Sequence, residues 1–379
     1  MKKSEKIKSN IGLAIVFILC AALCTPLVII YLDSVFDEYG LFLSVLFKLA
    51  VFLFAYYIQM IIHEAGHLFA GLLSGYSFGS FRIGNLMLIK ENGKYSIKRQ
   101  SIAGTGGQCL MTPPPMKNGK YPVVFYNIGG VLMNFLTLPI CVLMLARCVG
   151  KPLPYVICVT MFLSGLLIVL TNGIPLKLGM LNNDGANAVE VARNRESRMV
   201  FHNQFMIIDE IRRGKRLRDM DEALFPMPSD EGMKKSISAS GAVFFENRLM
   251  DEGKYDEALE LINRLLIEKN AIIGLYKNLL VADKITILLI KGEGLDAVEK
   301  YYTSAQYQAF KKQMKTNISV IRTDYAYALL KLQDEKIAGE ALALFDKCSK
   351  MHPYVSDIES EKELIALIDK SAKNTINSI

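Results

Sequence analysis

The sequence has few charged residues and lacks the cysteine pairs of a disulfide framework. Only 21% of its 379 residues are charged, and 51% are hydrophobic. Its seven cysteines form no CxxC pair, and most lie in apolar runs (Cys20, Cys24, Cys141, Cys148 and Cys158), which indicates free thiols. The glycine-rich stretch 104–107 is not followed by Gly-Lys-Ser/Thr, which excludes a phosphate loop. The basic residues behind the net charge of +7 are not interleaved with aromatic residues, so nucleic acid is not an expected partner.

Long apolar runs are absent from the second half of the chain. Four runs in the first half could cross about 30 Å of hydrocarbon: Ile11 to Tyr31, Leu41 to Leu73, Pro122 to Val149 and Leu153 to Thr171. The first run follows Met1-Lys2-Lys3 but lacks a small-residue cleavage site, so we read it as a retained helix rather than a signal peptide. The sequence thus predicts a mainly α fold, with a membrane-embedded bundle of about four spans (1–190), a basic juxtamembrane linker (191–230) and a soluble helical domain (231–379).

The distribution of basic residues predicts the orientation of the spans. The segment between the second and third spans has a single acidic residue, Glu91, and many basic ones (Arg82, Lys90, Lys94, Lys98, Arg99, Lys117 and Lys120). Since cytoplasmic loops carry the excess of Lys and Arg, this segment, the N-terminus and the C-terminal domain are all expected in the cytoplasm of a multi-pass cell-membrane protein. The basic linker would lie on the anionic lipid of the bilayer; a solvated helix face is the alternative (Arg193, Arg195, Arg198, Arg212, Arg213, Lys215, Arg216 and Arg218).

A metal-binding pattern interrupts the second apolar run. On a helix, His63 and His67 project from one face, where two imidazole nitrogens can bind one Zn²⁺, with Glu64 beside them. A catalytic zinc site needs three protein ligands, an open position for water and a carboxylate to take a proton, which makes Glu64 the candidate base. The alternative is a polar notch in a helix bundle, but ionisable groups within a span are costly without a function.

After the second span, the sequence pattern changes from one typical of a helix to one typical of β-strands. Phe81 to Lys90, Asn92-Gly93 and Lys94 to Arg99 predict a β-hairpin with a tight turn. Beyond it, Gly106, Gly107 and Gln108 would let an extended substrate pair with this segment as an added strand; a flexible loop is the alternative.

Polar residues in the third and fourth spans extend the pattern. Gly173 and Pro175 break the fourth helix near the inner face, and Asp184 follows as the candidate third ligand, although Asp184-Gly185 is also an ordinary turn signal. In the third span, Asn134 is an amide among apolar residues. Chemistry alone favours an interhelical hydrogen bond for it.

HEAGH, Gly130-x-x-x-Asn134 and Asn172-x-x-Pro175 ending in Asp184-Gly185 occur in the order seen in site-2 proteases. From about Leu41 to Ala188 the chain therefore resembles that family of intramembrane zinc metalloproteases. The resemblance implies that His63, His67 and Asp184 bind zinc, that Glu64 activates water, that Asn134 holds the substrate carbonyl as it becomes an oxyanion, and that Asn172 and Pro175 support the site. Two features depart from the family pattern: Val131 replaces a usual Pro, and four extra residues separate Pro175 from Asp184.

The soluble part contains weak repeats. Gly253-Lys254-Tyr255-Asp256-Glu257-Ala258 resembles the second half of a tetratricopeptide (TPR) unit, and fainter copies align on Ala297 and Ala341, 39 and 44 residues further on. A standard unit is about 34 residues long, so these would be irregular. We expect a short TPR-like solenoid that binds a cytoplasmic peptide or protein; a plain helical bundle is the alternative.

Together these features predict a zinc enzyme that hydrolyses peptide bonds in or near membrane spans of proteins, or in leader and signalling peptides. The competing hypothesis is a non-enzymatic membrane receptor or scaffold, in which the repeats bind a partner and the metal site is vestigial. A metal transporter is a third possibility, although such pathways usually need polar groups along several helices.

Overall fold

The computed structural model describes residues 41–91, 93–102, 105–178 and 181–377. The first predicted span, Ile11 to Tyr31, lies outside this part of the chain. Two compact units are present. Of the described residues, the bundle unit contains those from Leu41 to Ser77, Gly106–Cys109 and those between Pro114 and Arg193, and the helical unit contains those between Phe78 and Thr105, Leu110–Pro113 and those from Asn194 to Asn377.

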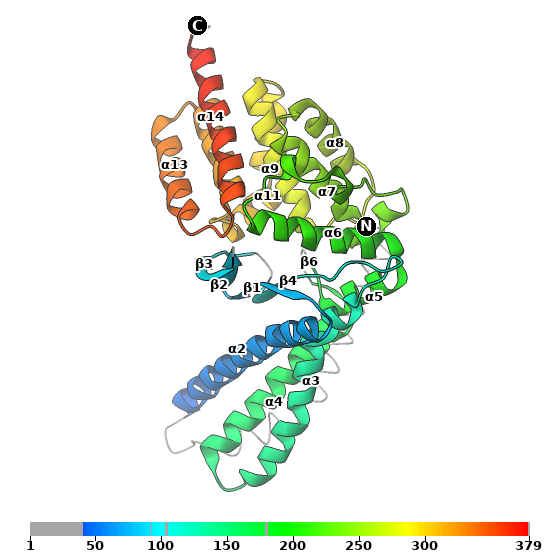
Figure 1. The fold of residues 1–379 in the computed structure, drawn as a ribbon. Coiled ribbons are helices and arrows are strands. Elements are labelled where there is room, and N and C mark those ends of the chain that lie inside the picture. Colours follow the sequence, from blue (N-terminus) through cyan, green and yellow to red (C-terminus); the bar gives the residue numbers. More distant parts are fainter. Residues whose placement is uncertain (1–40, 92, 103–104, 179–180, 378–379) are drawn as a thin grey trace. The chain divides into compact units, whose positions relative to one another are not determined.

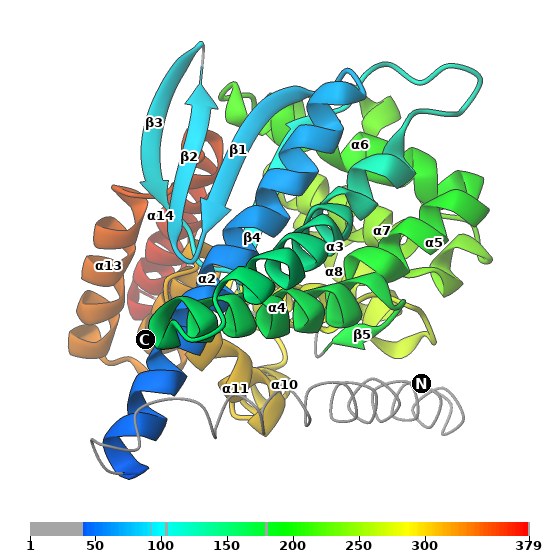
Figure 2. The same cartoon turned by 90° about the horizontal axis from the view of Figure 1, so that it is seen from below.

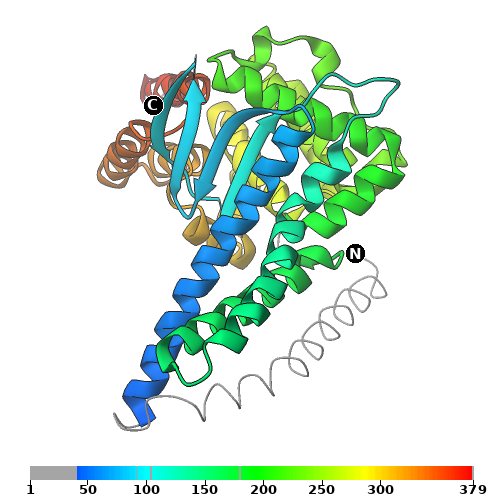
Figure 3. The same ribbon diagram turned by 60° about the horizontal axis from the view of Figure 1, so that its bottom comes forward.

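Three long apolar helices form the bundle unit. They are α2 (Leu41–Leu73), α3 (Val123–Arg147) and α4 (Pro152–Gly173), and each packs against the other two (Figure 3). Within the described residues, these are the helices long and apolar enough to cross a membrane. Their outer faces carry exposed apolar side chains such as Phe42 and Leu143, as expected for helices that face lipid rather than water. The second, third and fourth predicted spans are therefore confirmed as helices of membrane-spanning length.

Small residues bring α2 and α3 into backbone contact. A Cβ atom built on Gly66 would lie 2.4 Å from the carbonyl oxygen of Gly129, and one built on Gly129 would lie 2.6 Å from the Cβ of Ala70. Only glycine permits this approach, which is typical of close helix packing in membranes. The two helices are thus closest along the histidine-bearing turns of α2.

A four-stranded sheet follows α2 in the chain. Its strands β1 (Ser77–Ile83), β2 (Leu86–Glu91), β3 (Lys94–Arg99) and β4 (Gly107–Thr112) are arranged in the order β3-β2-β1-β4 (Figure 2). The predicted hairpin around 92–93 is present, with Leu88 opposite Ile97. The predicted single strand Phe81 to Lys90 is wrong, because the chain turns at Gly84 (φ +59°) and Arg82 pairs with Met87. A left-handed glycine closes this turn and makes two antiparallel strands from one apolar run.

Two short strands and a helix complete the bundle unit. After α4, β5 (Lys177–Leu178) and β6 (Leu181–Asn182) pair in antiparallel fashion, and α5 (Asp184–Arg193) begins directly afterwards. Helix α5 packs against both α3 and α4. The first residue of α5 is therefore brought back beside the membrane helices.

The helical unit is a succession of paired helices (Figure 1). Its elements are α6 (Arg195–Arg212), the 3-10 turns η2 (Leu217–Asp219), η3 (Glu222–Leu224) and η4 (Gly232–Lys234), α7 (Ser236–Asp251), α8 (Tyr255–Ile267), α9 (Gly274–Lys291), α10 (Leu295–Tyr302), α11 (Ala305–Gln313), α12 (Ile318–Ala326), the π-helical turn η5 (Tyr327–Leu332), α13 (Glu335–Ser349) and α14 (Val355–Asn377). Helix α7 packs on α8, α9 on α10 and α12 on α13. Of the three alanines that align the sequence repeats, Ala258 is fully buried, whereas Ala297 and Ala341 are partly exposed, so the repeats do not share one packing register.

The segment predicted to be a basic linker, 191–230, contains much regular structure. Helix α6 packs on α7, and the basic residues at its end face carboxylates of the same unit. Arg213 pairs with Asp209, Lys215 pairs with Glu210, and the buried Arg216 pairs with Asp251. These charges are therefore engaged within the protein.

Candidate metal centre

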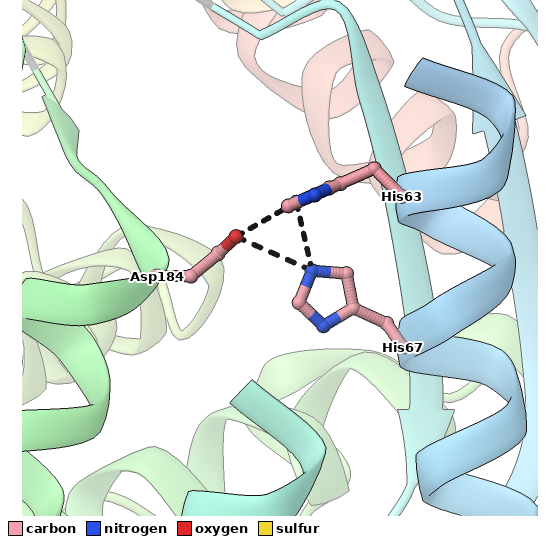
Figure 4. A group of neighbouring side chains, drawn as sticks. All are labelled: His63, His67 and Asp184. Atoms are coloured by element: carbon pink, nitrogen blue, oxygen red, sulfur yellow. Dashed lines mark hydrogen bonds and ion pairs between the residues drawn. The ribbon is translucent and has the colours of Figure 1, made fainter. Parts of the chain in front are cut away.

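The two histidines of α2 point at one carboxylate. The Nε2 atom of His63 lies 2.8 Å from Oδ2 of Asp184, and that of His67 lies 3.3 Å from the same oxygen (Figure 4). The two Nε2 atoms are 3.2 Å apart. Both histidines are buried, with 6% and 7% of their surfaces exposed. The spacing of four residues places the rings on one helical face, and the three groups together could hold a metal ion.

Asp184 reaches this position because Asn183 closes the loop before it. The Asn183 amide donates to the carbonyls of Thr171 and Ile174, and its Oδ1 accepts from the backbone N–H groups of Leu176 and Ala186. Asn183 thereby ties the end of α4 to the start of α5 and caps the first turn of α5. Asp184 is the first residue of α5, where the helix dipole favours a negative charge.

Hydrogen bonds at the far side of each ring decide which nitrogen faces the cluster. His67 Nδ1 lies 2.9 Å from the carbonyl oxygen of Tyr126, which can only accept, so this nitrogen carries a proton. His63 Nδ1 lies 2.8 Å from Oδ1 of Asn134. The orientation of the Asn134 amide follows from its other end, which donates to the backbone carbonyl of Gln59 and to Gln59 Oε1. Both histidines therefore donate through Nδ1, and both Nε2 lone pairs point at Asp184.

This arrangement brings together three electron-rich atoms, the two Nε2 atoms and Oδ2 of Asp184. With both imidazole protons on Nδ1, no proton lies between these three atoms. Burial alone would raise the pKa of Asp184, but the charge of a protonated His67 and hydrogen bonds from the two histidines outweigh this effect and hold the pKa below its ordinary range. The carboxylate is therefore ionised when an imidazole beside it carries the extra proton. Two imidazole nitrogens and a carboxylate oxygen within about 3 Å repel one another unless a cation lies among them. The cluster thus requires either an extra proton on one imidazole or a metal ion.

A glycine lets helix α3 pass close to the cluster. A Cβ atom built on Gly130 of α3 would lie 2.6 Å from Nε2 of His67 and 2.7 Å from Nε2 of His63. Any side chain here would occupy the volume next to both ligand atoms. Two imidazole nitrogens and one carboxylate oxygen match the three protein ligands of a catalytic zinc site.

Glu64 is buried next to the first histidine and lies against β4. A Cβ atom built on Gly107 would be 2.6 Å from Cγ and from Oε1 of Glu64. The glycine therefore lets the strand backbone pass close to the candidate base. Gly106 is adjacent to Met60 of α2, whereas the buried Oε1 of Gln108 has no hydrogen-bond partner among the described residues.

The structure gives some predicted residues roles other than those the resemblance implies. Asn134 is fully buried, and both its donor and acceptor sides are committed to Gln59 and His63, so in this state it positions a ligand rather than offering an N–H to an oxyanion. Asn172 donates to the carbonyl of Ile168 within α4, and Pro175 is exposed in the following loop. Among the hydrogen bonds of the described residues, neither side chain bonds to His63, His67 or Asp184.

Two residues at this centre were not singled out from the sequence. Gln59 joins the three helices, since its amide donates to Thr137 of α3 and to the carbonyl of Met161 of α4 while its Oε1 accepts from Asn134. The available signal in the sequence was a glutamine within an apolar run, one helical turn before the histidine motif. Asn183 was hidden by its neighbour Asn182, because nothing local distinguishes the two asparagines.

Comparison with protein-family models, with curated proteins and with solved structures finds no match to this chain.

Proposed function

We propose that this protein is an intramembrane zinc metalloendopeptidase of the site-2 protease type. The observation that carries the proposal is the convergence of His63 Nε2, His67 Nε2 and Asp184 Oδ2 with both Nδ1 protons committed elsewhere. Such a set of acceptors is costly to bury unless it binds a cation, and its position on an apolar helix makes a purely structural role more costly still.

Zinc is the ion that this donor set suits best. Imidazole nitrogens with one carboxylate oxygen are common zinc ligands, and the partners of the Nδ1 atoms are those that usually orient metal-bound histidines. A bound zinc ion would supply a Lewis acid and lower the pKa of a water molecule to about 7.

The chain itself supplies the remaining groups for peptide hydrolysis. Glu64 would take a proton from the attacking water and pass it to the leaving amine, because it is the buried carboxylate next to His63 in the chain. Asn134 would keep the His63 ring in its ligating orientation. The exposed backbone of Gly106 and Gly107 would guide an extended substrate segment past Glu64, since a spanning helix hides its carbonyls and must unwind before attack.

The substrates we propose are membrane proteins, or leader and signalling peptides, cut in or near their spans. The charge of the loops favours a cytoplasmic location for the N-terminus and for the helical unit, in a multi-pass cell-membrane protein. The paired helices of that unit support a TPR-like arrangement, for which a cytoplasmic peptide or protein is the natural partner.

Metal analysis and a single substitution test this function. We expect purified protein in detergent to contain close to one zinc per chain, and His63→Ala to remove it. Glu64→Gln should retain the zinc but not cleave a membrane-peptide substrate, and it should trap substrates that then co-purify. If the wild type contained no more zinc per chain than His63→Ala, a receptor or scaffold function would be favoured over a zinc enzyme. Equal cleavage by Glu64→Gln would exclude the proposed mechanism.

A further inference from the structure

The helical unit contains a polar cavity of about 240 Å³ that is independent of the metal centre. It is lined by residues of α7, α9, α12 and α14, together with Arg216 and His352. One water molecule occupies about 30 Å³ of liquid, whereas pockets for drug-sized ligands start near 300 Å³. The volume thus suits a single side chain or a chain terminus.

Carboxylates outnumber cations around this cavity. Four carboxylates line it (Asp251, Asp283, Asp357 and Glu361), against two guanidinium groups (Arg216 and Arg322). Arg322, which is 1% exposed, already holds both Asp283 and Glu361, at 2.6 and 2.8 Å. Arg216 is bound to Asp251 and also to Glu363 outside the lining. Both guanidinium groups are therefore saturated with carboxylates.

A further buried carboxyl group, that of Glu246 of α7, lies in the same unit but not in the lining of the cavity. It is fully buried, and neither of its oxygens has a hydrogen-bond partner among the described residues. Burial, together with the charge of Asp283, raises the pKa of Glu246 well above its usual value, and Arg322 only partly opposes this. Burial therefore favours the protonated, neutral form of this carboxyl group.

One lining residue points to a ligand directly. Ser356, at the start of α14, is 3% exposed, and its hydroxyl has no hydrogen-bond partner within the described part of the chain. Next to it, Asp357 is partly exposed and has a single long contact, 3.3 Å, with Nε2 of His352. A buried hydroxyl and an underused carboxylate on one turn of α14 can both accept from the same group.

We propose that this cavity binds a primary ammonium group, from a peptide amino terminus or a lysine side chain. An ammonium group is compact and has three donors, which suits separate single oxygens such as those of Ser356 and Asp357. A further guanidinium group fits less well, because the planar, paired sites are already taken by Arg216 and Arg322. The positive charge would also offset the excess of carboxylates. This inference does not depend on proteolysis.

Calorimetric titration of the full-length protein in detergent tests the cavity with small probes. Alanine amide presents a terminal ammonium group and Nα-acetyl-lysine amide presents a side-chain ammonium group, while Nα-acetyl-alanine amide is the neutral control. We expect one or both of the cationic probes to bind and the neutral probe not to bind. The probe that binds more tightly identifies the source of the ammonium group.

Three variants locate the binding. Asp357→Asn and Ser356→Ala should each weaken it at least about fivefold, because the first removes a negative charge and the second removes a hydroxyl acceptor. Both positions lie outside the buried network around Arg322, so the fold should stay intact. Asp346→Asn makes the same charge change at an exposed position of α13 and should bind as the wild type does. Equal affinity for the neutral probe, no binding of either cation, or the same affinity in Asp357→Asn and Asp346→Asn would overturn the proposal.

Discussion

Asn134 offers the sharpest test of how the metal centre is built. Its Oδ1 accepts a hydrogen bond from His63 Nδ1, and its amide NH₂ donates to Gln59 on the other side. Asn134→Ala would free the His63 ring to rotate and would leave buried groups of both neighbours unpaired. Loss of such an orienting partner typically weakens metal binding 10- to 100-fold, or about 1.4–2.7 kcal/mol.

The assay is a competition for zinc between the purified protein and a chromophoric chelator. Asn127→Ala is the matched control, because Asn127 is a buried amide two turns earlier on α3 that donates to the carbonyl of Val123 and has no hydrogen bond to either histidine among those described. Asn134→Asp should keep zinc affinity within about threefold of the wild type, because a carboxylate still accepts from His63 and such partners are common for metal-bound histidines.

The same series separates the two roles considered for Asn134. If the residue acted only on an oxyanion, Asn134→Ala would bind zinc normally and would lose about 100- to 1,000-fold in kcat. Unchanged zinc affinity in Asn134→Ala, or a loss no larger than that of Asn127→Ala, would refute the positioning role inferred from the structure.

Three further substitutions test other parts of the structure. Gly130→Ala should abolish zinc binding, measured as metal content, because the new methyl group would lie 2.6–2.7 Å from both Nε2 atoms; stoichiometric zinc in this variant would contradict the placement of the ion. Asn183→Ala should lower zinc affinity by at least about tenfold, since the loop that positions Asp184 would lose the hydrogen bonds of the Asn183 side chain. Unchanged affinity would show that the loop keeps its conformation without these hydrogen bonds. Glu246→Gln should raise the unfolding temperature of the helical unit more at pH 8 than at pH 5. Because the pKa of Glu246 is raised in the folded state, the wild type loses stability as the pH rises through that pKa. A difference in unfolding temperature between variant and wild type that does not change with pH would contradict this prediction.

The membrane helices could be read from the sequence because one physical requirement defines them. A helix that crosses hydrocarbon needs about 20 predominantly apolar residues, and the run Leu41 to Leu73, which forms α2, is long enough to contain them despite the polar residues of the histidine motif. The sheet was harder to predict. Both Phe81 and Leu88 belong to one apolar stretch, and only the turn at Gly84 reveals that they face each other on separate strands.

At the candidate metal centre, sequence spacing predicts the relative positions of side chains on one helix, but not which side chains of other helices contact them. His63 and His67 are fixed relative to each other by four residues of α2, so their convergence needs no tertiary information. The role of Asn134 depends on which side of its amide meets His63, and this is decided by Gln59, a residue 75 positions earlier in the chain. A polar side chain in an apolar span could be recognised, but its partner could not.

The loop between Pro175 and Asp184 shows how extra residues can be accommodated without displacing Asp184 from His63 and His67. The β5–β6 pair accommodates the extra residues. Because Lys177 lies opposite Asn182 in this pair, the chain leaves the hairpin beside the point at which it enters. Asn183 then bonds to groups on both sides of the insertion, from Thr171 to Ala186. The position of Asp184 is therefore set by the asparagine before it and by the end of α4, and a change in the number of residues within the hairpin leaves both of these unaltered.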